Sequence, residues 1–270
     1  MKSSWRGRTA LVTGASSGIG AATARRLAGA GLHVILSARR EDRLQALQEE
    51  IARAGGSAEA LPADLAVQAD REALYAQIIL THGGLDVLVN NAGLGWYGYY
   101  ADMPWDVAHE ILRVDVEAVL HLTTLFLPGM LARKFGRIIN VGSIIGSIPS
   151  QGTAMYSSSK AFLDSFSTVL YRETRGSGVE VCLVRPGAIK TDFFANSSQR
   201  AGLRYPFGEA GGSAEQVAER IWDLVQHPRR VAHVPGWMAL SRLLEPLTGW
   251  AQDLIGPVDL KRQKDGRGKG

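Results

Sequence analysis

Short apolar runs alternate with longer amphipathic stretches along most of this chain. The runs are typical of strands and lie at 8–13, 32–38, 57–65, 85–93, 136–141, 179–187 and 229–235. Apolar residues at helical spacing between these runs predict helices over 18–30, 41–54, 68–81, 105–133, 152–176 and 213–227. Strands separated by helices of this length predict an α/β fold that is doubly wound, with a seven-stranded, mostly parallel sheet and helices on both faces.

The stretch Gly142–Lys160 contains three side chains that together suit proton transfer. Tyr156 and Lys160 are four residues apart, so they share one face of a helix. A free tyrosine has a pKa of about 10, and a nearby ammonium is expected to lower that pKa and make the phenol a usable proton donor or acceptor. Ser143 follows the strand at 136–141, at the sheet edge where α/β proteins bind ligands. Taken alone, the Tyr-Lys pair is also explained by an aromatic ring that packs on a lysine stem.

A glycine-rich turn, TGASSGIG from Thr13 to Gly20, follows the first predicted strand. Glycine lets the backbone approach a pyrophosphate without interference from a Cβ atom, and the N–H groups that open a helix favour anionic oxygens. The spacing differs from the common Gly-x-Gly-x-x-Gly fingerprint of dinucleotide-binding folds. For this motif alone, a tight strand-to-helix turn without a ligand is the alternative.

Two further motifs stand at strand ends, Asn90–Gly93 and Pro186–Gly187. With the glycine turn and the Ser-Tyr-Lys set, they form four signals in a fixed order. On these motifs, the chain resembles the classical short-chain dehydrogenase/reductase (SDR) family over about residues 6–195. The resemblance implies a Rossmann-like fold, NAD(P)-dependent oxidoreductase activity, and catalytic roles for Ser143, Tyr156 and Lys160.

The same resemblance implies where the cofactor binds. In the family, an aspartate lies beside the adenine, residues after the fourth strand flank the adenosine, and a backbone group with a threonine hydroxyl binds the nicotinamide carboxamide. The matching positions in this chain are Gly14, Ser16, Ser17, Gly18, Ile19, Gly20, Asp64, Leu65, Asn90, Asn91, Ala92, Gly93, Tyr156, Lys160, Pro186, Gly187, Ile189 and Thr191. For Asn90, a structural role at the strand end is open beside the binding role.

The residues at the end of the second predicted strand indicate which nicotinamide cofactor the chain prefers. An acidic side chain about 20 residues past the glycine turn binds the ribose 2′-hydroxyl of NAD, whereas arginine suits a 2′-phosphate. Here Ala38 takes the acidic position and Arg39 follows. In the family this pattern implies that NADP(H) is preferred over NAD(H). A solvated start to the charged helix 41–54 is the alternative for both Arg39 and Arg40, and for Arg40 we favour it.

Asp115 is the main departure from the family pattern, which has asparagine at this position. In the family, that asparagine holds a water that links the lysine to bulk solvent. A carboxylate near Lys160 keeps the ammonium charged and partly opposes its effect on Tyr156. We therefore include Asp115 among the catalytic candidates and expect an altered pH profile.

Composition and charge weigh against several other classes of protein. The chain has 270 residues, of which 46% are apolar and 21% charged, which is ordinary for a globular protein. The last ten residues hold five basic groups and one acidic group and so account for the whole net charge of +4, which argues against a nucleic-acid groove elsewhere. Cys182 is the single cysteine and is expected to be a buried, inert thiol. No apolar run has the length of a transmembrane segment and the first strand leaves no room for a signal peptide, so we expect a cytoplasmic protein.

We expect residues 1–260 to form a single dinucleotide-binding and catalytic domain, and 261–270 to form a disordered basic tail. The aromatic segment 94–103 is interpreted as a wall of an apolar substrate pocket, or else as a cover over the core. Residues 192–213 lack periodicity and suit a substrate lid. Residues 236–257 form a C-terminal extension, for which core or interface packing is favoured over membrane binding because its basic residues are few.

The sequence thus predicts an NADP(H)-dependent oxidoreductase that interconverts a carbonyl and a secondary alcohol on a fairly apolar small molecule, with no metal site. In the family, the helices that match 105–133 and 152–176 pair between subunits, which implies a homodimer or homotetramer. The alternative is a non-catalytic NADP(H)-binding sensor or interaction protein, favoured by Asp115 and the C-terminal extension. Turnover of NADPH with ketones distinguishes the two.

Overall fold

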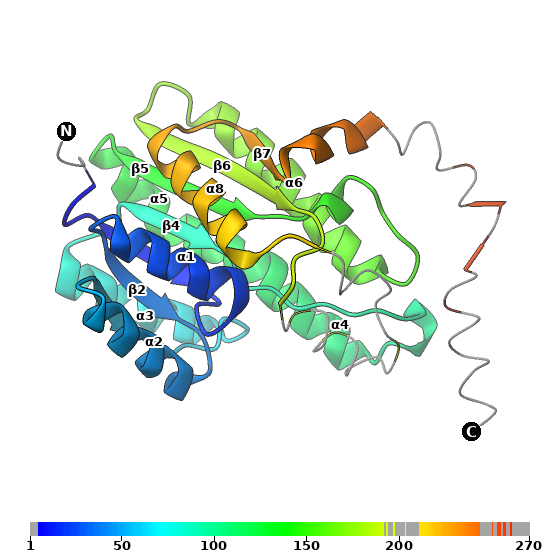
Figure 1. The fold of residues 1–270 in the computed structure, drawn as a ribbon, viewed down its shortest axis with the longest axis horizontal. Coiled ribbons are helices and arrows are strands. Elements are labelled where there is room, and N and C mark those ends of the chain that lie inside the picture. The colour runs from blue at the N-terminus through cyan, green and yellow to red at the C-terminus, as the bar shows by residue number, and fades with distance from the viewer. Residues whose placement is uncertain are drawn as a thin grey trace.

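The computed structural model describes residues 5–191 and 211–243, together with Phe193, Ser197, Leu203, Trp250, Asp253, Leu254, Gly256, Pro257 and Leu260. In this part of the chain, seven strands form one sheet in the order β3-β2-β1-β4-β5-β6-β7 (Figure 1). The strands are β1 (Thr9–Thr13), β2 (His33–Ser37), β3 (Ser57–Ala60), β4 (Val87–Asn90), β5 (Gly136–Val141), β6 (Val179–Pro186) and β7 (Val231–Val234). Every neighbouring pair is parallel, which confirms the predicted fold class.

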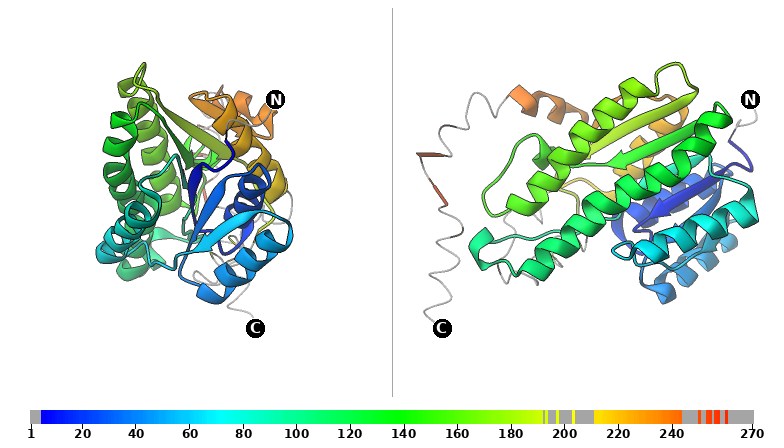
Figure 2. Two further views of the ribbon diagram at one scale, coloured as in Figure 1. Left: turned by 90° about the vertical axis from the view of Figure 1, so that its left-hand side faces the viewer. Right: turned by 180° about the vertical axis from the view of Figure 1, so that it is seen from behind.

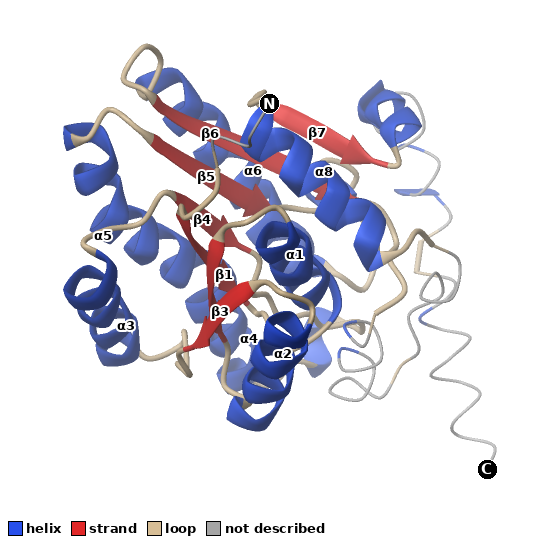
Figure 3. Ribbon diagram, turned by 60° about the vertical axis from the view of Figure 1, so that its left-hand side comes forward, coloured by secondary structure: helices blue, strands red, loops and turns tan. Residues whose placement is uncertain are grey.

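Helices cover both faces of the sheet (Figures 2 and 3). One face carries α1 (Gly18–Gly29), α2 (Glu41–Arg53) and α8 (Ala214–Gln226), and the other carries α3 (Gln68–His82), α4 (Trp105–Leu112), α5 (Ala118–Ala132) and α6 (Ala154–Glu173). Successive side chains of a strand point to opposite faces of the sheet, so a buried strand contributes side chains to the two cores on either side of the sheet. In β1, for example, Leu11 packs with the α3 and α5 side, whereas Val12 packs with the α1 and α8 side.

The strand order reverses at β1. The chain runs outward from β1 to β2 and β3 and then returns to β4 on the other side of β1. In doubly wound sheets, ligands bind in the crevice at the carboxyl ends of the strands beside such a reversal. The segments that follow β1, β4, β5 and β6 carry the glycine turn, Asn91–Gly93, Ser143 and Gly187, so the topology brings all four motifs to one edge.

The third strand is shorter than predicted, because it ends at Ala60 and the sequence pattern suggests a strand over 57–65. Pro62 has no N–H group and interrupts the ladder. The backbone still follows β2, since the N–H of Ala63 donates to the Ala38 carbonyl oxygen at 3.1 Å. This path carries the next residue, Asp64, to the edge where the other motifs lie.

Helices α4 and α5 form one continuous helix, Trp105–Ala132, through a π-helical turn at Arg113–Glu117. Among the described residues, it is the one helix that is long and apolar enough to cross a membrane by length and composition. The sequence analysis expects no such segment, because it finds no apolar run of the required length. Leu122, Phe126 and Met130 of this helix are buried in the core on the α3 side of the sheet. A core helix of a globular domain therefore accounts for its composition.

Cys182 lies in the middle of β6 with no exposed surface. Burial raises the pKa of its thiol to about 11. A neutral, inaccessible thiol is chemically inert, so the prediction of a buried, inert cysteine is confirmed.

The predicted basic tail at 261–270 and most of the predicted lid at 192–213 lie outside the described residues. Residues just before the lid segment and at its C-terminal end are described. Ile189 forms a parallel bridge with Gly212, and the N–H of Lys190 donates to the Gly212 carbonyl oxygen at 3.0 Å. The segment therefore leaves and rejoins the sheet edge at one place. Of the predicted C-terminal extension, Gly236–Leu243 forms 3-10 turns after β7.

Candidate active site

A cavity of about 620 Å³ opens at the carboxyl edge of the sheet. It is lined by most of the residues that the sequence motifs single out: Gly14, Ser16, Ser17, Gly18, Ile19, Arg39, Asp64, Leu65, Asn91, Ala92, Gly93, Ser143, Tyr156, Lys160, Pro186, Gly187, Ile189 and Thr191. Three predicted site residues, Gly20, Asn90 and Asp115, do not line it. Motifs that are far apart in the sequence thus meet around a single cavity.

The glycines after β1 are required by the backbone conformation and by close packing. Gly14 and Gly18 have φ angles of +65° and +53°, in the left-handed region that favours glycine. A Cβ atom on Gly18 would lie 3.0 Å from Thr191 Cγ2, and one on Gly20 would clash with the Gly14 carbonyl oxygen. Gly18 therefore keeps the cavity open beside the first turn of α1, where a pyrophosphate fits. Gly20 instead lets α1 pack against the turn.

Hydrogen bonds from Thr13 tie the ends of β1 and β4 together below the cavity. The Thr13 hydroxyl donates to the Val89 carbonyl oxygen at 3.1 Å and accepts from the N–H groups of Asn91 and Ala92 at 2.9 and 3.0 Å. The Asn91 amide returns a hydrogen bond to the Thr13 carbonyl oxygen at 2.8 Å. These bonds fix the backbone of Asn91 and Ala92, which line the cavity.

Asn90 lies in the core, with 2% of its surface exposed. Its amide nitrogen donates to Asn140 Oδ1 at 2.9 Å, and the Asn140 amide nitrogen donates to Ser167 Oγ at 2.8 Å. This chain of polar groups links β4, β5 and α6. Of the two roles open for Asn90, the structure therefore supports the structural one.

Arg39 and Arg40 both line the cavity but make different contacts. Arg39 is exposed, and its Nη1 atom lies 3.0 Å from Glu110 Oε1 in α4. Arg40 is half-buried, and its Nη2 atom donates to the hydroxyls of Ser16 and Ser17 at 2.8 and 2.9 Å. The interpretation of Arg40 as a solvated helix start is therefore wrong, because its guanidinium lies against the glycine turn. The two hydroxyl residues inside the turn are the sequence signal for this contact.

The predicted catalytic side chains lie together at the cavity wall. Ser143 caps the 3-10 turn Ile144–Gly146, and its Oγ atom accepts a hydrogen bond from the Ile145 N–H at 3.3 Å. Tyr156 is in the first turn of α6, with its phenol close enough to the Ser143 side chain for Ser143 to act on the phenol pKa. Lys160 follows one turn later and is buried, with its Nζ atom 5.6 Å from the centre of the Tyr156 ring. The helical spacing thus brings the phenol and the ammonium to the same face.

Asp115 lies in the π-helical turn and is fully buried next to Lys160. Its Oδ2 atom is 3.4 Å from Lys160 Nζ and accepts a hydrogen bond from Ser159 Oγ at 3.2 Å, while Oδ1 accepts from the Leu94 N–H at 2.7 Å. Lys160 Nζ also donates to the Val141 carbonyl oxygen at 3.4 Å. Burial raises the pKa of Asp115, and the Lys160 charge opposes that rise. Turns of this π-helical kind are frequent at functional sites.

The pKa of Tyr156 is raised, whereas the sequence analysis expects Lys160 to lower it. Burial of the phenol is the largest cause and the charge of Asp115 adds to it, while the hydrogen bond with Ser143 opposes the rise. The Lys160 ammonium is paired with Asp115, so its charge is largely balanced within the wall of the cavity. Tyr156 therefore holds its proton at neutral pH, which is the state that can donate a proton to an oxygen.

The aromatic segment 94–103 contributes less to the cavity than predicted. Leu94 and Gly95 line the cavity, but the aromatic side chains of the segment do not. Trp96 and Tyr97 are buried, with 5% and 3% of their surface exposed. The alternative role of covering the core is the one that these two side chains fill.

Phe193, from the predicted lid, supplies an aromatic wall instead. It lines the cavity together with Ser197, and its ring centre lies 5.2 Å from that of Tyr156. Leu94 and Gly95 come from the predicted aromatic wall, and Phe193 and Ser197 from the predicted lid. The other lining residues outside the predicted site are neighbours of motif residues, mostly at strand ends: Ala38, Arg40, Ala63, Val114, Val141 and Gly142.

Comparisons with known proteins define the family. A family model described as short chain dehydrogenase matches residues 8–202. A short chain dehydrogenase of Pseudocercospora fijiensis is 33% identical over 98% of this chain and 86% of its own length. The 3-oxoacyl-acyl-carrier-protein reductase FabG of Escherichia coli is 35% identical over 80% of this chain and 89% of its own length.

Solved structures agree with this result. A short-chain dehydrogenase from Sphingobium yanoikuyae in complex with NADPH is 29% identical and superimposes with a TM-score of 0.79, over 92% of this chain and 95% of that one. Further solved relatives carry NADP in one case and NADH in another. The chain therefore belongs to the short-chain dehydrogenase family. It is an NAD(P)-dependent oxidoreductase of that family.

Proposed function

We propose that the chain interconverts a carbonyl and a secondary alcohol on a fairly apolar small molecule, with NADP(H) as the cofactor. The observation that carries the proposal is that Ser143, Tyr156 and Lys160 line the same cavity as the glycine turn. The bound cofactor supplies or accepts the hydride. The chain's own residues bind and orient the reactants and move the proton.

In the reductive direction, Tyr156 donates its phenolic proton to the substrate carbonyl oxygen. The raised pKa of Tyr156 keeps that proton in place until negative charge develops on the oxygen. The Ser143 hydroxyl donates a hydrogen bond to the same oxygen and stabilises the developing charge. Lys160, held by Asp115 and by the Val141 carbonyl oxygen, stabilises the phenolate that remains and binds the cofactor ribose.

The preference for NADP(H) over NAD(H) is supported by the donors at the glycine-turn end of the cavity. Arg40 with its two serine partners and the nearby Arg39 present positive charge and hydroxyl groups to a 2′-phosphate. Ala38 lines the cavity at the position where NAD-binding sites have an acidic residue. The ribose 2′-hydroxyl of NAD therefore lacks its usual carboxylate partner here.

An apolar substrate is supported by apolar side chains in the cavity wall. Leu94, Val114 and Phe193 contribute apolar or aromatic surface to the cavity. A 3-oxoacyl thioester is one suitable class, since a relative at 35% identity is named as a 3-oxoacyl reductase. Aromatic ketones and steroids are others.

Self-association as a homodimer or homotetramer, in the cytoplasm, completes the proposal. Phe162 and Val169 on α6 are 40% and 46% exposed. Contact with a second copy of the chain removes this apolar surface from water, which stabilises a dimer. Sedimentation velocity on the purified protein measures the oligomeric state, and a monomer at micromolar concentration argues against this part of the proposal.

The activity is tested by following NADPH absorbance with a panel of small aliphatic ketones, aromatic ketones, steroids and 3-oxoacyl thioesters. Turnover that is fastest on the larger apolar compounds supports the proposal. Turnover restricted to small polar carbonyls supports the reaction but contradicts the apolar substrate. Tight NADPH binding without turnover on any compound favours the non-catalytic sensor.

A further inference from the structure

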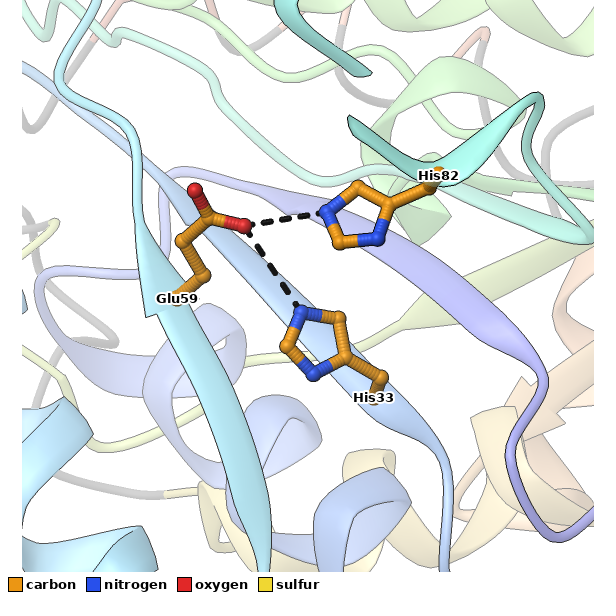
Figure 4. Close-up of side chains that lie close together, drawn as sticks. All are labelled: His33, Glu59 and His82. Atoms are coloured by element: carbon orange, nitrogen blue, oxygen red, sulfur yellow. Dashed lines mark hydrogen bonds and ion pairs between the residues drawn. The ribbon is translucent and has the colours of Figure 1, made fainter. Parts of the chain in front are cut away.

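Two histidines and a glutamate meet at the edge of the sheet opposite the cavity. His33 begins β2, Glu59 lies in β3, and His82 ends α3, so three elements each supply one side chain (Figure 4). Among the residues that the structure describes, one ligating atom from each of the three lies within 4.8 Å of the others. The side chains are partly buried, with exposures of 26%, 33% and 19% in the same order.

The carboxylate of Glu59 points between the two imidazole rings (Figure 4). Its Oε2 atom is 3.0 Å from His82 Nε2 and 3.7 Å from His33 Nε2. Zinc bonds of about 2.0–2.2 Å in tetrahedral geometry put neighbouring ligand atoms about 3.4 Å apart. The two observed separations bracket that value, so small side-chain movements accommodate an ion.

The contacts of His33 leave one of its two ring nitrogens available to bind a metal ion. Its Nδ1 atom lies 2.7 Å from Ser57 Oγ, and when Nδ1 carries the proton and donates to this hydroxyl, Nε2 presents a lone pair. Nε2 is buried and has no hydrogen-bond partner, because Glu59 is too distant for one. Metal ions bind the neutral form of histidine, through a ring nitrogen that carries no proton.

We propose that His33, Glu59 and His82 form a binding site for one divalent transition-metal ion, with zinc as the best match. Two imidazoles and one carboxylate are a ligand set that Zn²⁺ favours, and the exposure of the side chains leaves room for water as a fourth ligand. The sequence analysis expects no metal site. The three residues are separated by 23 or more positions and match no spacing motif.

The position of the site indicates a structural role rather than a catalytic one. His33 and Ser57 stand at the amino ends of β2 and β3, whereas the cavity lies at the carboxyl ends. The five residues of β2 span about 13 Å at the usual rise per residue, which separates the two sites. A metal ion here joins the short edge strand β3 to β2 and to the end of α3.

Zinc binding to tag-free protein, measured by isothermal titration calorimetry, tests the proposal. We expect one Zn²⁺ per chain and, at a free concentration of about one hundred times Kd, a melting temperature about 5 °C higher than without metal. His82→Gln and Glu59→Gln should each abolish both effects. His227→Gln, at a side chain that is 75% exposed and outside the cluster, should leave them unchanged.

Three further measurements keep the test independent of folding defects and of the proposed activity. Ser57→Ala leaves the three ligands in place and should weaken Zn²⁺ binding about tenfold, because it removes the partner that orients His33. Co²⁺ bound to the wild type should give the intense visible absorption of a tetrahedral site, and His82→Gln should lose it. NADPH turnover should persist after chelation. No stoichiometric Zn²⁺ binding, or binding that His82→Gln and His227→Gln affect equally, overturns the proposal.

Discussion

Asp115 Oδ2 lies 3.4 Å from Lys160 Nζ, and the two side chains are 0% and 5% exposed. A buried carboxylate and ammonium at this distance largely balance each other, and removal of either partner leaves an uncompensated charge. Because Tyr156 is one helical turn from Lys160, this pair sets the charge that the phenol experiences. The Asp115–Lys160 pair therefore predicts that Asp115 affects the pKa of Tyr156, and a pH–rate profile can measure that effect.

Asp115→Asn should make alcohol oxidation possible at lower pH. The charge of Asp115 contributes to the raised pKa of Tyr156, so its removal lowers that pKa and increases the phenolate fraction at any pH below the midpoint. Alcohol oxidation needs the phenolate as proton acceptor. At pH values where the oxidation rate still rises with pH, Asp115→Asn should therefore oxidise alcohol about threefold or more faster than the wild type. The pH–rate profile of alcohol oxidation with NADP⁺ measures the shift.

Ser159→Ala is the matched control for this variant. It removes a hydrogen bond to Asp115 Oδ2 but leaves the carboxylate charge in place. The profile of Ser159→Ala should therefore stay close to that of the wild type. Superimposable profiles for wild type and Asp115→Asn contradict an electrostatic effect of Asp115 on the reaction.

Arg40→Ala should weaken NADPH use more than Arg39→Ala. Arg40 is held against the glycine turn by two serine hydroxyls, whereas Arg39 is exposed and paired with Glu110. Loss of a charge-assisted contact of about 1.5–3 kcal/mol raises the KM for NADPH about 10- to 100-fold. The KM for NADH, measured on the same protein, should change little. Equal losses with NADPH and NADH in Arg40→Ala contradict a contact with the 2′-phosphate.

Gly20→Ala should destabilise the fold. A Cβ atom at this position has no space beside the Gly14 carbonyl oxygen and the Asn91 side chain. Overpacking costs about 1–3 kcal/mol, which corresponds to a fall in melting temperature of about 2–10 °C. Differential scanning calorimetry measures the change.

Gly29→Ala in the same helix is the control, since a Cβ atom there meets nothing within 4 Å. Its melting temperature should equal or exceed that of the wild type, because alanine is the better helix former. If both variants melt alike, close packing is not the reason for glycine at position 20.

Most of the fold can be predicted from the sequence, because the spacing of apolar residues and the length of each apolar run are properties of short segments of the chain. The alternation of apolar runs and amphipathic helices predicts the seven strands, and the glycine and asparagine motifs at their ends indicate the carboxyl edge. The boundary of β3 is predicted less well, because Pro62 interrupts the ladder while the backbone continues beside β2.

The site is predicted in its residues but not in its electrostatics. Helical spacing places Tyr156 beside Lys160, yet it contains no information on the burial that raises the pKa of the phenol or on the pairing of Asp115 with the ammonium. The contact of Arg40 with Ser16 and Ser17, and that of Phe193 with Tyr156, likewise depend on tertiary structure. The cluster of His33, Glu59 and His82 leaves no local signal at all.

The most direct test of the proposed chemistry compares the wild type with Tyr156→Phe, using NADPH consumption on the best carbonyl substrate and NADPH affinity on the same samples. The substitution removes the hydroxyl and keeps the ring that packs beside Phe193. Loss of a positioned general acid predicts turnover at least about a hundredfold lower, with NADPH affinity unchanged within error. Turnover by Tyr156→Phe at the wild-type rate would contradict proton transfer by Tyr156.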